Sequence, residues 1–225
     1  MTDLEIFAAL HMMMDEDVWV AQSVILQSVA PVHLCEIGAG NGDWAIGAAT
    51  MSDALDVTLI DDFAIAMSPP YFWPKTSAEL LDHCRQTSLG GRAQYRVLDK
   101  LPDDTFDVIR LAARWDIAEV REAMVWIVKH LAPEGVVFVD HLSGTMVPNR
   151  FLALVEQIQA KALRPFWFGG NQGGFCHWDD DCNAIQQRLL TGQGVSYRAR
   201  LRLLDDQAIV QTKRPGVWMQ QFAWS

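Results

Sequence analysis

The sequence has no apolar run long enough to cross a membrane, no low-complexity tract, no internal repeat and no strongly basic segment. Because a transmembrane helix needs about 20 consecutive apolar residues, we expect no membrane partner. The 28 acidic residues outnumber the 18 lysines and arginines, which gives a formal net charge of −10. Nucleic acids favour basic surfaces, so we expect no nucleic-acid partner either. The one basic stretch, RARLR at 198–202, alternates like the solvated face of a strand.

Cysteine is also scarce. The chain has four cysteines, none of them in a C-x-x-C pair, and we find no signal peptide: Cys35, Cys84, Cys176 and Cys182. These features predict reduced thiols and a cytoplasmic location. Half of the 225 residues are hydrophobic, which is enough for a sizeable core.

Hydrophobic periodicity predicts the order of the helices and strands. Two helices are expected within 3–29, with a break near 15–17, ending at Pro31. Strands are then expected at 32–38, 56–62, 93–99, 106–112 and 136–142, and helices at 42–51, 77–89, 117–131 and 147–163. The stretch APEG at 132–135 predicts a turn. The last sixty residues predict strands at 165–170, 173–178, 195–204 and 208–214.

This alternation predicts an α/β fold: a Rossmann-like, doubly wound, mostly parallel sheet with antiparallel C-terminal strands. We expect an N-terminal helical cap at 1–30 and a single domain at 31–225. In such sheets, ligands bind at the carboxyl ends of the strands.

The stretch EIGAGNG (36–42) follows the first predicted strand and places three glycines in the turn before a helix. Glycine lets the chain turn tightly and lets a ligand touch the backbone. The spacing G-x-G-x-G, followed by Asp43, differs from the G-x-G-x-x-G that binds a pyrophosphate. Glu36 suits a cationic group, and Asp61, 25 residues later at the end of the second strand, suits ribose hydroxyls. These features favour S-adenosylmethionine; a dinucleotide site and a turn that serves only packing are the alternatives.

With LIDD (59–62) and VLDKLPDDTFDVI (97–109), this stretch resembles the class I S-adenosylmethionine-dependent methyltransferases over about residues 30–165. The resemblance implies a cofactor site in which the first turn lines the methionine part, the second strand holds the ribose and the third strand faces the adenine. The residues of the first turn are Glu36, Gly38, Ala39 and Gly40. Those after the second strand are Asp61, Asp62 and Phe63, with Phe63 against the adenine, and those after the third strand are Asp99, Lys100 and Leu101.

The nearest branch is that of the catechol and macrocin-type O-methyltransferases, which hold a divalent metal with an acid after the fourth strand and another after the fifth. Asp140 matches the fifth-strand acid, but the fourth-strand position falls at Ala112, which cannot ligate. The resemblance therefore implies no metal, and it leaves His141 as the general base. A structural role for His141 is the alternative.

The methyl acceptor is expected to be a small molecule, bound by residues from four stretches: Tyr71 and Trp73 in SPPYFWP (68–74), Arg114 and Trp115, Asp140, and His177 and Trp178 in GGFCHWDDDC (173–182). The first stretch could be a lid or a rigid loop that fills a core. The last is a conceivable metal site, although a strand that runs into a helix-capping acidic turn is favoured.

The predicted function is a methyltransferase that acts on a small molecule, with oxygen favoured over nitrogen as the methylated atom. The alternatives are a non-catalytic protein of the same fold that binds the cofactor or a partner, and another reaction on this fold. The apolar N-terminal helices and the C-terminal strands could form a homodimer.

Overall fold

The computed structural model describes residues 2–10, 12, 14–63, 73–87, 89, 92–113, 116–140, 142, 148–169 and 172–191. No helix within these ranges is both long and apolar enough to cross a membrane.

A seven-stranded sheet forms the centre of the molecule, in the order β3-β2-β1-β4-β5-β7-β6. The parallel strands are β1 (His33–Ile37), β2 (Asp56–Ile60), β3 (Gln94–Leu98), β4 (Phe106–Leu111) and β5 (Leu131–Val139). Strand β7 (Gln172–His177) runs antiparallel to β5, and β6 (Leu163–Gly169) antiparallel to β7. The predicted doubly wound sheet with antiparallel C-terminal strands is confirmed. The strands predicted at 195–204 and 208–214 lie outside the described residues.

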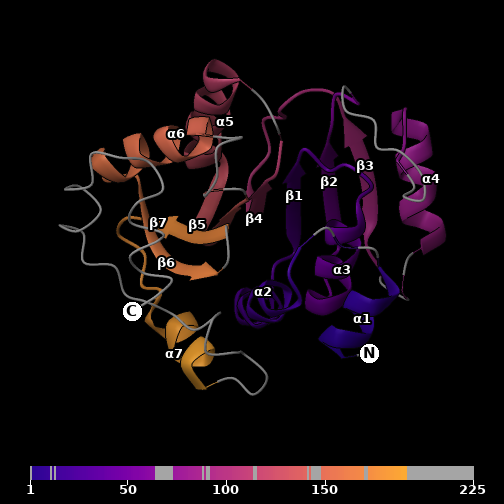
Figure 1. The fold of residues 1–225 in the computed structure, drawn as a ribbon, viewed down its shortest axis with the longest axis horizontal. Coiled ribbons are helices and arrows are strands. Elements are labelled where there is room, and N and C mark those ends of the chain that lie inside the picture. Colours follow the sequence, from indigo (N-terminus) through magenta and orange to yellow (C-terminus); the bar gives the residue numbers. More distant parts are fainter. Residues whose placement is uncertain are drawn as a thin grey trace.

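Helices cover both faces of the sheet (Figure 1). Helices α5 (Ile117–His130) and α6 (Pro148–Gln159) cover one face. The other face carries α1 (Asp3–Ala9), α2 (Glu16–Val29), α3 (Asp43–Ser52) and α7 (Asn183–Thr191), while α4 (Ser77–Thr87) packs beside β3. The sheet thus separates two apolar cores, and every inner strand is buried on both sides.

Capping residues explain where two of these helices begin and end. Asp15 is the N-cap of α2, so the predicted break near 15–17 falls at the helix start, and Ala30 ends it in the left-handed conformation. Asp116 begins α5 with a capping box to Glu119, and its carboxylate accepts backbone N–H bonds from the first turn.

The turn predicted at 132–135 is instead part of β5. Leu131 already pairs with Phe106, and the next pair is Val108 with Val136. The residues between them bulge out of the ladder, and Glu134 takes a left-handed φ of 62°. The bulge at 132–135 resembles a turn, but β5 already begins before it, at Leu131.

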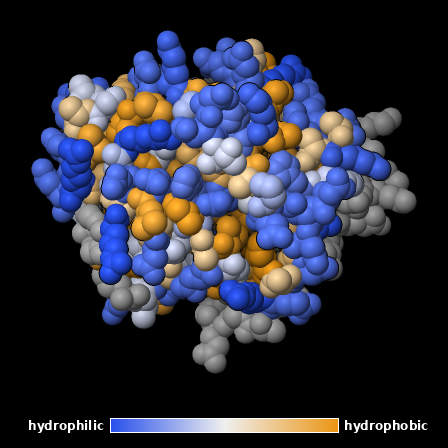
Figure 2. Space-filling model, turned by 180° about the vertical axis from the view of Figure 1, so that it is seen from behind, coloured by the Kyte–Doolittle hydropathy of each residue, from blue (hydrophilic) through white to orange (hydrophobic). Residues whose placement is uncertain are grey.

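The exposed large apolar side chains are dispersed over several elements. Apolar side chains emerge in several places between polar and charged ones on the face opposite to that of Figure 1 (Figure 2). Among the described residues the exposed ones lie on α1, α5, α6 and two loops: Leu4, Val125, Leu152, Val32 and Leu55. Isolated exposed apolar residues are normal on a protein surface.

All three glycines of the turn from β1 into α3 have a positive φ, and an added Cβ would meet different surroundings at Gly38 and at Gly42. Gly38 has φ +78°, and a Cβ placed there would lie 2.3 Å from the backbone nitrogen of Ala113. Gly42 has φ +81°, but its Cβ would meet only side-chain ends, Cys84 Sγ at 3.0 Å and Leu80 Cδ1 at 3.1 Å. The backbone after β1 therefore packs directly on the backbone after β4.

We expect Gly38→Ala to destabilise the protein more than Gly42→Ala. Both substitutions force a side chain into the left-handed region, which costs about 1–2 kcal/mol. Only Gly38→Ala also pushes against backbone, which raises its expected cost to about 3 kcal/mol or more. Denaturant unfolding of the two variants measures the difference, and equal losses would show that the contact with Ala113 relaxes freely.

Candidate functional site

Backbone hydrogen bonds align the carboxyl ends of the central strands. The residues that follow β1, β4 and β5 each donate a hydrogen bond to the last residue of a neighbouring strand: Gly38 to Ile60 at 2.8 Å, Ala112 to Ile37 at 2.8 Å, and Asp140 to Leu111 at 3.0 Å. The predicted residues after β1, β2, β4 and β5 therefore lie along one edge of the sheet.

A buried cluster of three charged side chains lies just inside this edge. Arg110 in β4 donates from Nη1 to Glu36 Oε1 and from Nη2 to Asp140 Oδ2. Glu36 and Arg110 face each other in the β1–β4 register. The three residues are 1%, 8% and 2% exposed in the order Glu36, Arg110, Asp140. With both carboxylates ionised, the cluster carries one net negative charge.

Trp44 on α3 packs against the guanidinium group of Arg110. The guanidinium carbon of Arg110 lies 5.0 Å from the centre of its ring, in a cation–π contact. Trp44 is held in turn by a hydrogen bond from Nε1 to Gln22 Oε1 at 2.8 Å, and Gln22 donates to Gln172 at 2.7 Å. These buried side-chain contacts fix the orientation of Arg110.

The cluster has unused hydrogen-bonding atoms. Within the described part of the chain, Glu36 Oε2, Asp140 Oδ1 and Arg110 Nε are buried without a hydrogen-bond partner. Buried polar atoms in folded proteins are nearly always paired with protein, water or ligand. Two buried, unpaired carboxylate oxygens suit a ligand that carries hydrogen-bond donors. A cationic donor suits them better than a neutral one, because the carboxylates are negatively charged.

Burial also changes the acidity of Glu36. Loss of water raises the pKa of Glu36 to about 7, and the neighbouring Arg110 guanidinium opposes this rise. The carboxyl therefore gains or loses its proton near neutral pH, and a cationic ligand would favour the ionised form.

Asp61 joins the end of β2 to the glycine turn. Its Oδ2 accepts a hydrogen bond from Gly40 N at 2.7 Å, and its Oδ1 accepts one from Phe63 N at 2.7 Å. Burial raises the pKa of Asp61, and the two backbone bonds oppose the shift. The indole of Trp73 lies on Gly40, where a Cβ would be 2.8 Å from the ring. Trp73, predicted to contact the acceptor, thus lies against the predicted cofactor turn.

The other predicted cofactor residues lie on the same edge. Ala39 is buried in the glycine turn, Asp62 is exposed beside Asp61, and three residues follow β3: the exposed Asp99 and Lys100, and the half-buried Leu101. The structure brings the whole predicted cofactor set together at the ends of β1, β2 and β3. Four predicted residues lie outside the described residues: Tyr71, Arg114, Trp115 and His141.

His177 and Trp178 are not brought to this edge. Because β7 runs antiparallel to β5, its last residue lies near the amino ends of the parallel strands. His177 Nε2 lies 3.1 Å from the carbonyl oxygen of Leu131, where β5 begins. Trp178 lies beside Lys161, whose Nζ is 5.9 Å from the ring centre. This placement argues against the predicted role of both residues in the acceptor pocket.

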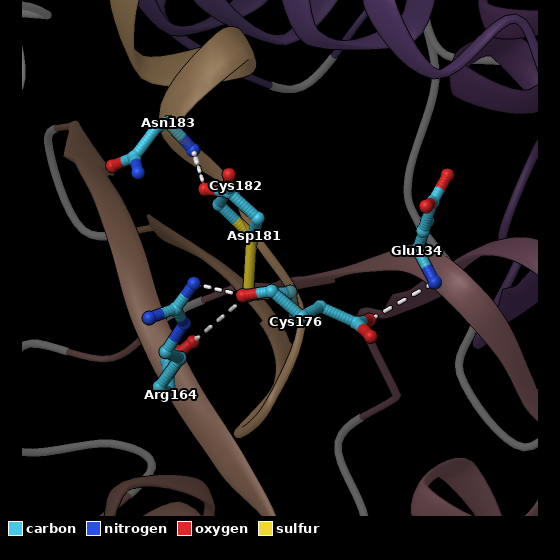
Figure 3. The surroundings of a disulfide bond; sticks show 7 residues. Glu134, Arg164, Cys176, Asp181, Cys182 and Asn183 are labelled. Atoms are coloured by element: carbon cyan, nitrogen blue, oxygen red, sulfur yellow. Dashed lines mark hydrogen bonds between the residues drawn. A yellow bond between two sulfur atoms is a disulfide. The ribbon is translucent and has the colours of Figure 1, made fainter.

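The acidic stretch after β7 serves the fold. Asp181 Oδ1 accepts a hydrogen bond from Asn183 N at 2.9 Å at the start of α7 (Figure 3). Asp180 Oδ2 accepts one from Glu134 N at 3.0 Å. Asp180 also accepts a bond from Arg164 through its backbone oxygen. The favoured interpretation, a helix-capping turn, is confirmed. No group of three metal-binding side chains occurs among the described residues.

The structure corrects the expectation of four reduced cysteines. Cys176 and Cys182 form a disulfide between β7 and the start of α7, with their Cα atoms 7.3 Å apart (Figure 3). This pair could not be predicted from the sequence, because a separation of six residues matches no redox motif. Cys35 and Cys84 are free and buried.

Among the described residues, the side chains near Asp140 do not fit a divalent metal. Ala112 offers only a methyl group, and its carbonyl accepts a hydrogen bond from Arg150 Nη2 at 3.1 Å. Arg150 Nη1 also donates to the carbonyl of Asp140 at 2.8 Å. Asp116 is used as the α5 cap, and Asp140 itself is paired with Arg110. Magnesium needs several oxygen ligands in octahedral geometry, which this set does not supply.

Sequence reasoning missed Arg110, Arg150 and Trp44. The signal for Arg110 was present, because FDVIRLA predicts a buried strand and a buried charge needs a partner. Arg150 lies in the amphipathic helix α6 and Trp44 in the largely buried helix α3, and the sequence does not show which side chain of either helix reaches the edge of the sheet.

Comparisons with known proteins show the fold. No protein-family model matches the sequence, and no curated protein matches it. The chain is similar to the solved structure of the S-adenosylhomocysteine-bound methyltransferase PaMTH1 from Podospora anserina, with 13% identity, a TM-score of 0.53, and coverage of 75% of this chain and 80% of that one. It is also similar to cofactor-bound Rv0187 from MTB, with 12% identity, a TM-score of 0.50, and coverage of 79% of this chain and 89% of that one.

Another match is the mitomycin 7-O-methyltransferase MmcR, with 17% identity, a TM-score of 0.45 and coverage of 70% of this chain. This chain spans 53% of that enzyme's length, so about half of it. At these identities the similarity concerns the fold alone, the Rossmann-like α/β fold that the sequence predicted.

Glu36 should make the stability of the protein depend on pH. Its pKa is about 7 in the folded state and 4.5 ordinarily, so between these values the folded state binds more protons than the unfolded state. The free energy of unfolding should therefore fall as pH rises from about 4.5 to about 7, by on the order of 3 kcal/mol, and stay level above that range. Denaturant unfolding at several pH values measures this slope.

Glu36→Gln should remove this slope, and Glu122→Gln on the exposed side of α5 is the matched control. The same slope in wild type and in Glu36→Gln would contradict the assignment to Glu36.

Proposed function

We propose that the protein is an S-adenosylmethionine-dependent methyltransferase that acts on a small molecule, on an oxygen atom. The observation that carries this proposal is Glu36 Oε2, a buried carboxylate oxygen without a hydrogen-bond partner among the described residues, next to the glycine turn at the end of β1. An ammonium group is the ligand group that such an oxygen binds best.

The rest of the predicted cofactor set supports the same ligand. Gly38 and Gly40 bring bare backbone to the edge beside Glu36, and Asp61 lies across the turn at the end of β2. Each Asp61 oxygen accepts one backbone N–H and keeps lone-pair capacity for a ribose hydroxyl. When bound, the cofactor would supply the methyl group on its sulfonium. Glu36 would hold the ammonium and Asp61 the ribose.

The acceptor side of the proposal rests on Asp140. Its Oδ1 is buried and has no partner among the described residues, so it can accept a hydrogen bond from a hydroxyl group of the acceptor. His141 follows it directly in the sequence and remains our prediction for the general base. The small-molecule acceptor fits the acidic charge of the chain, which disfavours nucleic acid. A cytoplasmic location and assembly as a homodimer remain predictions.

A non-catalytic binding protein is the second candidate function. Arg110 already neutralises part of the charge of Glu36 and Asp140, and Ala112 stands where related enzymes hold an acid. Incubation with methyl-labelled S-adenosylmethionine and a panel of phenols, sugars and carboxylates separates the candidates. Label in an acceptor supports the enzyme. Cofactor binding without transfer supports the binder.

We expect the protein to bind S-adenosylmethionine and S-adenosylhomocysteine at least about tenfold more tightly than NAD, because a cationic ligand matches Glu36. Asp61→Ala should weaken cofactor binding by about 1–3 kcal/mol, since the ribose loses a charged acceptor. Asp56→Ala, at the amino end of the same strand, is the matched control and should leave affinity unchanged. Calorimetry measures all of these, and tighter binding of NAD would overturn the assignment.

We expect activity to survive chelation by EDTA, because the side chains that the structure describes near Asp140 do not fit a metal. His141→Ala should lower turnover by roughly 10²–10⁴ with little change in cofactor affinity, since a general base contributes rate rather than binding. Steady-state kinetics and calorimetry test both statements. Activity that EDTA abolishes and magnesium restores would contradict the first, and an unimpaired His141→Ala enzyme the second.

A further inference from the structure

We propose that Arg110 is a built-in cation that takes the place of a divalent metal ion between the carboxylates of Glu36 and Asp140. In this role it is a positioning residue: it holds each carboxylate by one oxygen and leaves the other oxygen available to a ligand. The inference deepens the proposed function, but its test requires neither the cofactor nor an acceptor.

The geometry of the guanidinium supports this role. Glu36 and Asp140 approach from different strands, β1 and the end of β5, and each binds a different terminal nitrogen of the same group. Their bound oxygens are therefore held around one small positive centre. A metal ion would hold the same two carboxylates in the same way, through one or both oxygens of each.

Burial favours a positive charge at this position. Both carboxylates are almost fully buried, and the cation–π contact with Trp44 keeps the arginine in the same layer. Two ionised carboxylates without a cation between them would repel each other in a region of low dielectric constant. A different cation at the position of the Arg110 guanidinium could also compensate the charges of the two carboxylates.

The residues that surround Asp140 show why this cation is an arginine. Ala112 has no ligating side chain, and Arg150 occupies the backbone carbonyls of Ala112 and Asp140 that could otherwise serve as oxygen ligands. A guanidinium can bridge these two carboxylates without further ligands, because each of its terminal nitrogens donates to one carboxylate oxygen.

The test is a gain of metal binding. Arg110→Met keeps the length and the apolar stem of the side chain but removes its charge, and Arg110→Lys keeps a charge. Mn²⁺ is the probe, because it favours carboxylate ligands and its binding can be followed by electron paramagnetic resonance and calorimetry. With Arg110 removed, both oxygens of each carboxylate become available to Mn²⁺ and water can fill its remaining positions. We therefore expect Arg110→Met to bind Mn²⁺ at least about tenfold more tightly than wild type and than Arg110→Lys. Asp140→Asn in the Arg110→Met background should remove this gain.

Several results would overturn the proposal. These are a folded Arg110→Met variant without gain, a gain that persists after Asp140→Asn, and a wild-type protein that already binds Mn²⁺ through Asp140. If Arg110→Met does not fold alone, Mn²⁺ should restore its circular dichroism, and failure to do so also contradicts the proposal. Absence of S-adenosylmethionine binding to wild type would overturn the proposed function and leave the Mn²⁺ result to stand independently.

Discussion

Arg110 lies between two buried carboxylates, and the chemistry available at the carboxyl edge of the sheet depends on this contact. A single positive charge on β4 stabilises Glu36 and Asp140, but it cannot neutralise both. The remaining negative charge, together with the unpaired oxygens of the two acids, makes this edge suited to a ligand that brings hydrogen-bond donors and a positive charge.

The rest of the fold holds this contact in place. The register of β1 and β4 puts Glu36 opposite Arg110, Trp44 lies under the guanidinium, and Arg150 ties the backbone after β4 to the backbone after β5. Gly38 lets these backbones approach, since any side chain there would collide with Ala113. Packing and electrostatics thus serve the same few residues, and the site lies on rigid elements rather than on loops alone.

Much of the fold could be predicted from the sequence, because buried strands that alternate with amphipathic helices leave few topologies. The glycine turn with Glu36 and the acid Asp61 also led to the edge of the sheet at which we propose that the cofactor binds, since both lie at the ends of strands. Contacts between distant residues were beyond sequence reasoning. His177 was assigned to the acceptor pocket although antiparallel C-terminal strands were predicted, because the sequence does not show that β7 pairs with β5 and ends at the amino end of that strand. The disulfide of Cys176 depends on where α7 begins. Arg110 was overlooked because its two partners come from strands that only the register brings together.

A crystal structure of the protein with S-adenosylhomocysteine tests the central claim most directly. The account predicts density along the carboxyl edge of the sheet, with the amino group of the ligand within hydrogen-bonding distance of Glu36 Oε2, the ribose hydroxyls at Asp61, and Arg110 still between Glu36 and Asp140. Density for the ligand elsewhere, or an ammonium group that does not contact Glu36, would contradict it.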